Sequence, residues 1–162
     1  MSLDILFIHP NASKKIYQGL SNNHSAIEPP IWAGMLANHC RKKNFNVEIL
    51  DCEAEKLDYI SGATEIKNRK PRVACFVVYG QQPSASSQNM EGAVATSQEL
   101  KKLEPSIKTI FVGGHISALP KETLSSESSI DFVALNEGVY AISNLLKIQN
   151  LDDEKYIKKV KG

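Results

Sequence analysis

The sequence has few cysteines, no long apolar run and no excess of either charge. Cys40, Cys52 and Cys75 are odd in number and widely spaced, so they do not predict a disulfide scaffold. No apolar run approaches the roughly 20 residues of a membrane-spanning helix, and Met1–Pro10 lacks the basic segment of a signal peptide. The 19 Lys and Arg residues against 18 Asp and Glu give a net charge of +1, which argues against a nucleic-acid binder. We therefore expect a cytoplasmic protein with neither a membrane span nor a nucleic-acid partner.

The order of the apolar segments predicts an α/β fold, and 162 residues suit a single domain. Short, mostly apolar runs that suit strands lie at Leu3–Ile8, Asn46–Leu50, Val73–Tyr79, Thr109–Val112 and Asp131–Leu135. Continuous rather than alternating apolar character is typical of parallel strands that are covered on both faces. We predict a doubly wound (Rossmann-like or flavodoxin-like) five-stranded parallel sheet with helices on both faces and strand order 2-1-3-4-5.

Helical segments fill the intervals between these runs. They are expected at Pro29–Cys40, Glu55–Arg69, Met90–Leu103, Lys121–Leu124 and Gly138–Leu146. Ser86 or Ser87 is expected to cap the third helix, because serine hydroxyls accept hydrogen bonds from the free amides of a first turn.

Ligands of such a sheet bind outside the carboxyl ends of the strands, near the reversal of strand order. The loops that reach this edge are His9–Ser13, Gly80–Ser87, Gly113–Pro120 and Asn136–Gly138. The first loop has neither a glycine-rich phosphate loop for a flavin mononucleotide nor Gly-x-Gly-x-x-Gly for a dinucleotide. His9 and Tyr79 stand where a phospho-acceptor receiver carries acidic residues. These polar, nearly uncharged loops suit a large, weakly charged organic ligand.

Two adjacent glycines, Gly113 and Gly114, follow the fourth strand directly. Without a Cβ atom they let a bulky, flat ligand approach the backbone, or they form a tight turn. His115 comes next, and it either donates a hydrogen bond to a phosphate or amide of a ligand or lies exposed in a loop. The residues alone leave both interpretations open.

Several segments occur in an order that carries a family resemblance. They are Glu28–Ala37, Val47–Asp51, the run PSIKTIFVGGHISALP at Pro105–Pro120, and DFVALNEG at Asp131–Gly138. Together they resemble the cobalamin-binding domain of radical S-adenosylmethionine enzymes over nearly the whole chain. The resemblance implies a Rossmann-like domain that holds cobalamin over the carboxyl end of its sheet. The nucleotide tail would then lie between the sheet and a helix, along Gly113–Gly114.

The resemblance also implies where the cofactor is held, with the loop after the first strand below the corrin. The expected cofactor-binding residues are His9, Asn11, Gln82, Ser84, Ser86, Gly113, Gly114, His115, Ser117, Glu137 and Gly138. His115 is among them because it directly follows the two glycines. The Asp-x-His-x-x-Gly sequence of better-known cobalamin carriers is absent, which implies base-off cobalamin without a protein histidine ligand. Asn136 stands where the family usually has glycine. We expect Gly113→Leu to block the tail and abolish cobalamin binding without unfolding the sheet.

The chain lacks the Cys-x-x-x-Cys-x-x-Cys motif of a radical enzyme's iron–sulfur cluster. Cys40 and Cys75 are expected to be buried thiols and Cys52 a loop thiol, and neither a catalytic residue nor a side-chain metal site is expected. The resemblance implies that S-adenosylmethionine, a [4Fe-4S] cluster and chemistry such as methyl transfer belong to a radical domain, in cis or in trans. We expect residues 1–150 to form the cobalamin-binding domain and residues 151–162 to begin the linker to that partner.

Two other functions stay open at this point. One is a non-catalytic receiver-like or protein-interaction domain, because the same fold serves many functions. The other is an enzyme that binds a different nucleotide-tailed ligand at the same Gly113–Gly114 edge.

Overall fold

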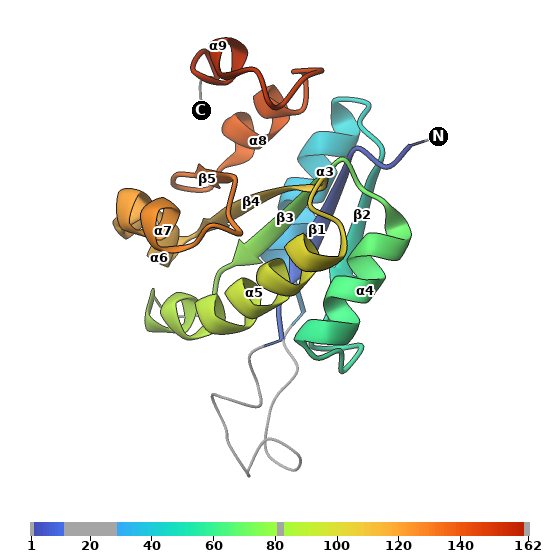
Figure 1. Cartoon of the computed structure of the whole chain (residues 1–162), viewed down its shortest axis with the longest axis vertical. Helices are drawn as coiled ribbons and strands as arrows, with labels where there is room; N and C mark the ends of the chain where they lie inside the picture. Colours follow the sequence, from blue (N-terminus) through green and yellow to red (C-terminus); the bar gives the residue numbers. More distant parts are fainter. Residues whose placement is uncertain (1, 12–28, 81–82, 161–162) are drawn as a thin grey trace.

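The computed structural model describes residues 2–11, 29–80 and 83–160, which form a five-stranded sheet between layers of helices (Figure 1). The strands are β1 (Ile5–His9), β2 (Val47–Asp51), β3 (Val73–Val78), β4 (Lys108–Gly113) and β5 (Phe132–Ala134). Every neighbouring pair is parallel, and the order is β2-β1-β3-β4-β5. The predicted fold class and strand order are confirmed.

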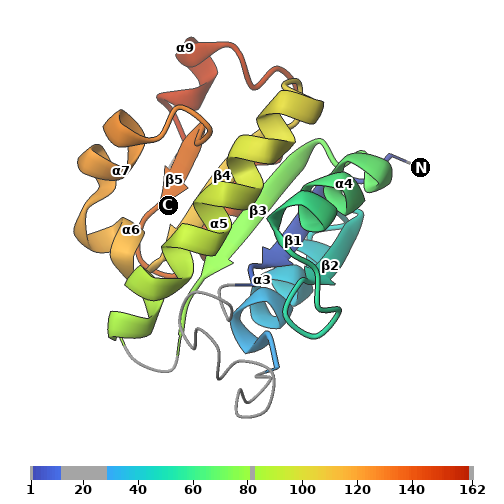
Figure 2. The same ribbon diagram turned by 60° about the horizontal axis from the view of Figure 1, so that its bottom comes forward.

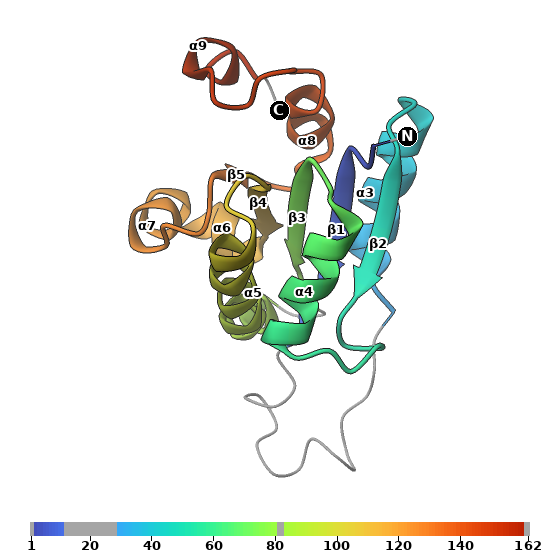
Figure 3. The same cartoon turned by 45° about the vertical axis from the view of Figure 1, so that its right-hand side comes forward.

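Helices cover both faces of this sheet, as Figures 2 and 3 show. On one face lie α3 (Ile31–Lys42) and α8 (Val139–Leu145). On the other lie α4 (Tyr59–Arg69), α5 (Pro83–Leu103) and α6 (Gly114–Ala118). The helix α7 (Pro120–Ser126) follows α6 beside β5, and α9 (Glu154–Ile157) is the last helix of the described chain.

The central strands are apolar throughout because each of their two sides faces a separate core. Along β1, Ile5 and Phe7 pack with α3 and α8, whereas Leu6 and Ile8 pack with α4 and α5. β3 alternates in the same way, and all of its residues are buried. Continuous apolar runs are therefore what a sheet covered on both sides requires.

The start of α4 differs from the prediction. Residues 52–56 form turns, so the helix begins at Tyr59 rather than at Glu55. Asp58 fixes this start, because its carboxylate accepts the Ser61 amide while the Ser61 hydroxyl accepts the Asp58 amide. Such a reciprocal capping box decides a helix boundary more strongly than apolar periodicity does.

Two loops expected at the carboxyl edge are partly helical. α5 already begins at Pro83, so Ser86 and Ser87 lie inside the helix and the prediction that they cap it is wrong. α6 begins at Gly114, where a loop was expected to follow the fourth strand. Both helices start directly at the edge where a ligand is expected.

The last part of the described chain stays in contact with the sheet layers. Leu151 is buried in the core beneath α8, and Val160 packs against the same core. Residues on both sides of position 150 thus share one hydrophobic core.

The short strand β5 is held to β4 by a polar cluster at the opposite, amino edge of the sheet. The Asp131 carboxylate accepts hydrogen bonds from the Thr109 amide at 2.7 Å and from Lys101 Nζ at 2.6 Å. The Thr109 hydroxyl accepts the Asp131 amide at 3.0 Å and donates to the Ser129 carbonyl at 2.6 Å. These bonds stabilise a strand of three residues that has few ladder bonds of its own.

All three cysteines are buried free thiols, which confirms the expectation for Cys40 and Cys75. The expectation of a loop thiol for Cys52 is only half right: it lies in a turn but is 2% exposed. Burial raises the pKa of Cys40 to about 11. Burial and the nearby carboxylates of Glu55 and Asp51 raise the pKa of Cys52 to about 12, and burial raises that of Cys75 well above its ordinary value.

We expect the native protein to react slowly with an aromatic disulfide reagent at about pH 8, because the thiolate is the reactive form and these thiols stay protonated. Unfolding in guanidinium should expose three reactive thiols per chain. The absorbance of the released aromatic thiolate measures both reactions. One thiol that reacts at once in the native protein would show that a cysteine is accessible.

Candidate functional site

The order of the strands reverses between β1 and β3. α3 connects β1 to β2 on one face of the sheet, and α4 connects β2 to β3 on the other. A cavity of about 230 Å³ opens at the carboxyl ends of these strands, and we call it the switch-point pocket. Its walls include His9 from β1, Val77 and Tyr79 at the end of β3, and Trp32 and Met35 from α3. Ligands of open parallel sheets bind at this position.

Two aromatic side chains form one wall of the switch-point pocket. The rings of Trp32 and Tyr79 are stacked, with centroids 4.5 Å apart and planes 21° from parallel. Trp32 remains 38% exposed, so the stack lies at the mouth of the pocket rather than in the core. The predicted site does not include either residue, although both flank the expected edge in the sequence.

The polar residues after β1 are already engaged within the protein. His9 Nε2 lies 3.3 Å from a carboxylate oxygen of Glu53, and both side chains are mostly buried. Asn11 Nδ2 donates to the Leu57 carbonyl at 3.0 Å. These contacts tie the loop after β1 to the turn after β2 and place His9 at the side of the pocket.

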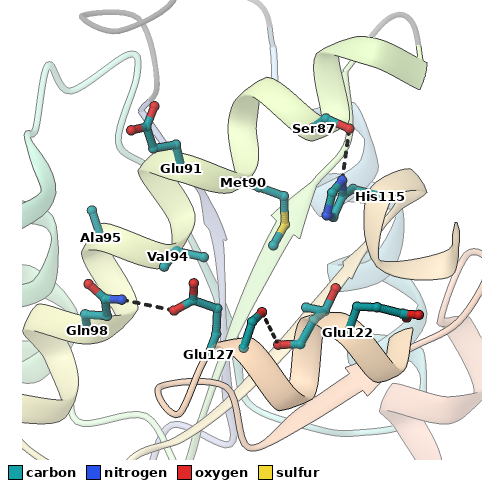
Figure 4. Close-up of a pocket in the computed structure, with 11 residues that line it drawn as sticks. Ser87, Met90, Glu91, Val94, Ala95, Gln98, His115, Glu122 and Glu127 are labelled. Carbon is teal, nitrogen blue, oxygen red and sulfur yellow. Dashed lines mark hydrogen bonds between the residues drawn. The ribbon is translucent and has the colours of Figure 1, made fainter. Parts of the chain in front are cut away.

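A second cavity, of about 490 Å³, lies between α5 and α7 and is called the α5–α7 groove (Figure 4). Met90 and Val94 of α5 line it, and the Met90 side chain points into it. His115 lines the same groove, with its Nδ1 2.9 Å from the Ser87 hydroxyl. Gln98 donates to Glu127 at 3.0 Å across the groove. His115 and His9 therefore line different cavities.

The predicted glycine pair has two distinct roles. A Cβ atom on Gly113 would lie 2.1 Å from the Val78 carbonyl oxygen, so β3 and β4 could not keep their register. A Cβ atom on Gly114 would make only an ordinary contact, 3.6 Å from Ser86, and Gly114 is exposed. The expectation that Gly113→Leu leaves the sheet folded is wrong, because the clash is with backbone.

Ser86 fills the space beside this glycine pair. Its hydroxyl donates to the Val78 carbonyl at 2.5 Å and accepts the His115 amide at 3.0 Å, and the residue is 2% exposed. Ser86 thus joins β3 to the start of α6 and does not face solvent. Of the other residues expected in this loop, Ser84 belongs to the first turn of α5 and Gln82 lies outside the described residues.

The site residues predicted after β5 also differ in role, because Gly138 is required by the fold whereas Glu137 is exposed. Gly138 has a φ of +66°, and a Cβ atom there would lie 2.8 Å from Val112, so glycine is required by the fold. Asn136 also has a positive φ, of +52°, which asparagine tolerates better than most residues. Asparagine therefore fits this left-handed position without a glycine. Glu137 between them is exposed, and Ser117 accepts the Asn136 amide at 2.9 Å.

The carboxyl edge therefore gathers most of the predicted site residues, but not around a single cavity. Among the described residues, no group of three or more His, Cys, Asp or Glu side chains could hold a metal ion. No helix in the described part of the chain is long and apolar enough to cross a membrane.

Comparison with known proteins gave one family. The model of the B12 binding domain matches residues 19–146, which is most of the chain. A search of curated proteins found no match.

We expect Gly113→Ala to destabilise the fold by about 3 kcal/mol or to prevent folding, because overpacking against rigid backbone cannot relax. The matched control is Gly114→Ala, where the added methyl group has room. Urea unfolding followed by circular dichroism gives both free energies. Equal stability of the two variants would contradict the assigned difference between the neighbouring glycines.

Proposed function

Since the chain belongs to the B12-binding domain family, we propose that it holds cobalamin over the carboxyl edge of its sheet, beside the switch-point pocket. Family membership supports cobalamin binding as such. The position is supported by one observation, the apolar cavity at the reversal of strand order.

The residues at this edge fit part of a cobalamin molecule. The switch-point pocket, at about 230 Å³, is smaller than the roughly 300–1,000 Å³ of sites that enclose a drug-sized ligand. It has room for one ring system, so most of a corrin would lie outside it. The aromatic wall of Trp32 and Tyr79 favours a flat, weakly charged group. Exposed Gly114 leaves backbone open to approach at the same edge.

We also propose that cobalamin binds base-off and without a histidine ligand from this chain. His9 faces Glu53, and His115 is held by Ser87 in the α5–α7 groove. Neither imidazole stands free above the switch-point pocket. Among the expected site residues, we assign ligand contact to His9, Asn11, Gly114 and Glu137, and support of the edge to Ser86, Gly113, His115, Ser117 and Gly138.

Bound cobalamin supplies a cobalt centre that carries a methyl group or changes its oxidation state, whereas the protein binds and orients it. Cys40, Cys52 and Cys75 are buried free thiols, and among the described residues no group of three or more His, Cys, Asp or Glu side chains could ligate an iron–sulfur cluster. We propose that a radical S-adenosylmethionine domain, in cis or in trans, supplies the remaining chemistry, such as methyl transfer. The sequence resemblance, and not the family match, supports this part.

A second candidate function is a protein-interaction domain. The observation that favours it is the exposed apolar surface of α3 and α8, where Ile31 is 64%, Met35 58% and Tyr140 67% exposed. A partner domain that covers bound cobalamin would also use this exposed surface. Retention of cobalamin by this chain therefore distinguishes cobalamin binding from a pure protein-interaction function.

We expect the purified protein to retain hydroxocobalamin after desalting. After reduction to the cobalt(II) state, its electron paramagnetic resonance spectrum should show no nitrogen splitting, because no imidazole coordinates the cobalt. Visible absorbance measures how much cofactor is retained. Folded protein without colour would contradict cobalamin binding by this chain.

The base-off assignment is tested separately with His9→Gln and His24→Gln. His24 is included because it lies outside the described residues. Unchanged spectra in both variants are expected. Nitrogen splitting that disappears in either variant would identify that histidine as a cobalt ligand.

We further expect Gly114→Leu to weaken hydroxocobalamin binding at least tenfold, because a side chain there covers the open edge of the sheet. Its stability should stay close to that of the wild type, since the added Cβ has room. Titration followed by absorbance gives the affinity, and Gly114→Ala serves as the matched control. Wild-type affinity in Gly114→Leu would show that the ligand does not approach the backbone at this glycine.

A further inference from the structure

Tyr79 connects several parts of the carboxyl edge. Its ring stacks on Trp32 of α3 and lines the switch-point pocket. Its backbone carbonyl accepts a hydrogen bond from Asn89 of α5 at 3.1 Å. Its hydroxyl donates to the backbone carbonyl of Asn136, in the loop between β5 and α8, at 2.5 Å. The Tyr79 side chain thus joins α3 to the loop that follows β5.

The loop that Tyr79 reaches is held from two sides. Asn136 has a positive φ, and its amide donates to the Ser117 hydroxyl at 2.9 Å. Ser117 in turn donates to the Gly113 carbonyl at 2.9 Å. The position of Asn136, and with it that of the exposed Glu137, therefore depends on one hydrogen bond from β3 and one from α6.

The tyrosine hydroxyl keeps its proton under ordinary conditions. Burial, followed by the negative charge of Glu137, raises the pKa of Tyr79 to about 12. Tyr79 is therefore a hydrogen-bond donor to Asn136 at neutral pH.

We propose that Tyr79 is a positioning residue of the switch-point pocket: its ring, with Trp32, forms the wall that contacts the ligand, and its hydroxyl fixes residues 135–138 beside that wall. A planar group that enters the pocket meets this stack, so occupancy of the pocket and the position of the β5–α8 loop are coupled. The contact with cobalamin rests on the proposed function, whereas the link to the loop does not.

The link to the loop is tested on ligand-free protein with Tyr79→Phe, which keeps the ring and removes the hydroxyl. Amide hydrogen exchange at Asn136 should become about fivefold faster, as expected for one lost hydrogen bond. Tyr59→Phe is the matched control, because Tyr59 lies at the start of α4, is 48% exposed and does not line the pocket. Unchanged exchange at Asn136 would overturn the link.

The contact with the ligand is tested by hydroxocobalamin titration of the same variants and of Trp32→Ala. We expect about fivefold weaker binding in Tyr79→Phe, at least tenfold weaker binding in Trp32→Ala, and no change in Tyr59→Phe. Hydroxocobalamin should also slow exchange at Asn136 in the wild type but not in Tyr79→Phe.

The outcomes separate the two proposals. Wild-type protein that retains no cobalamin would overturn the proposed function and the ligand contact, and the exchange rates would still decide the link to the loop. Cobalamin bound with wild-type affinity by both pocket variants would leave the proposed function standing and overturn the positioning role of Tyr79.

Discussion

The carboxyl edge of the sheet depends on the close approach of β4 to β3 at Gly113. The Val78 carbonyl lies where a side chain of residue 113 would begin, and it accepts the Ser86 hydroxyl from α5. The same hydroxyl accepts the His115 amide at the start of α6. β3, β4 and α5 therefore meet at the Val78 carbonyl, and the Ser86 hydroxyl connects this point to α6.

The sheet itself separates the two cavities at this edge. The switch-point pocket lies with α3 on one face of the sheet, and the α5–α7 groove lies on the other. The first has an aromatic wall and lies where the strand order reverses, which suits a flat organic group. The groove has a polar rim with His115, Gln98 and Glu127. A cobalamin-binding domain needs the first kind of surface for a ring system, which is why the proposed site centres on Trp32 and Tyr79 rather than on His115.

Local sequence features were sufficient for the fold but not for its boundaries. The apolar runs predicted the five parallel strands, because a parallel sheet covered on both sides needs continuous apolar strands. The order 2-1-3-4-5 came from the common doubly wound arrangement, and the structure confirms it. The start of α4 was placed too early, since the capping box of Asp58 and Ser61 outweighs apolar periodicity. The capping role expected for Ser86 was wrong for another reason. Its hydroxyl bonds to β3, a contact between segments that sequence spacing does not reveal.

The sequence by itself determined the fold class and, through the segments that resemble a family, the class of cofactor, and it predicted the carboxyl edge of the sheet as the ligand site. The fold class follows from periodicity and segment order, which are local or additive properties of the chain, whereas the class of cofactor follows from the resemblance. The tertiary structure alone decided that Gly113, and not Gly114, is required by the fold. Only the register of β3 and β4 brings the Val78 carbonyl against Gly113. The tertiary structure likewise decided that Trp32 and Tyr79, 47 positions apart by their numbering, share one wall. Contacts between residues distant in the chain depend on packing, and packing is set only when all the layers are assembled.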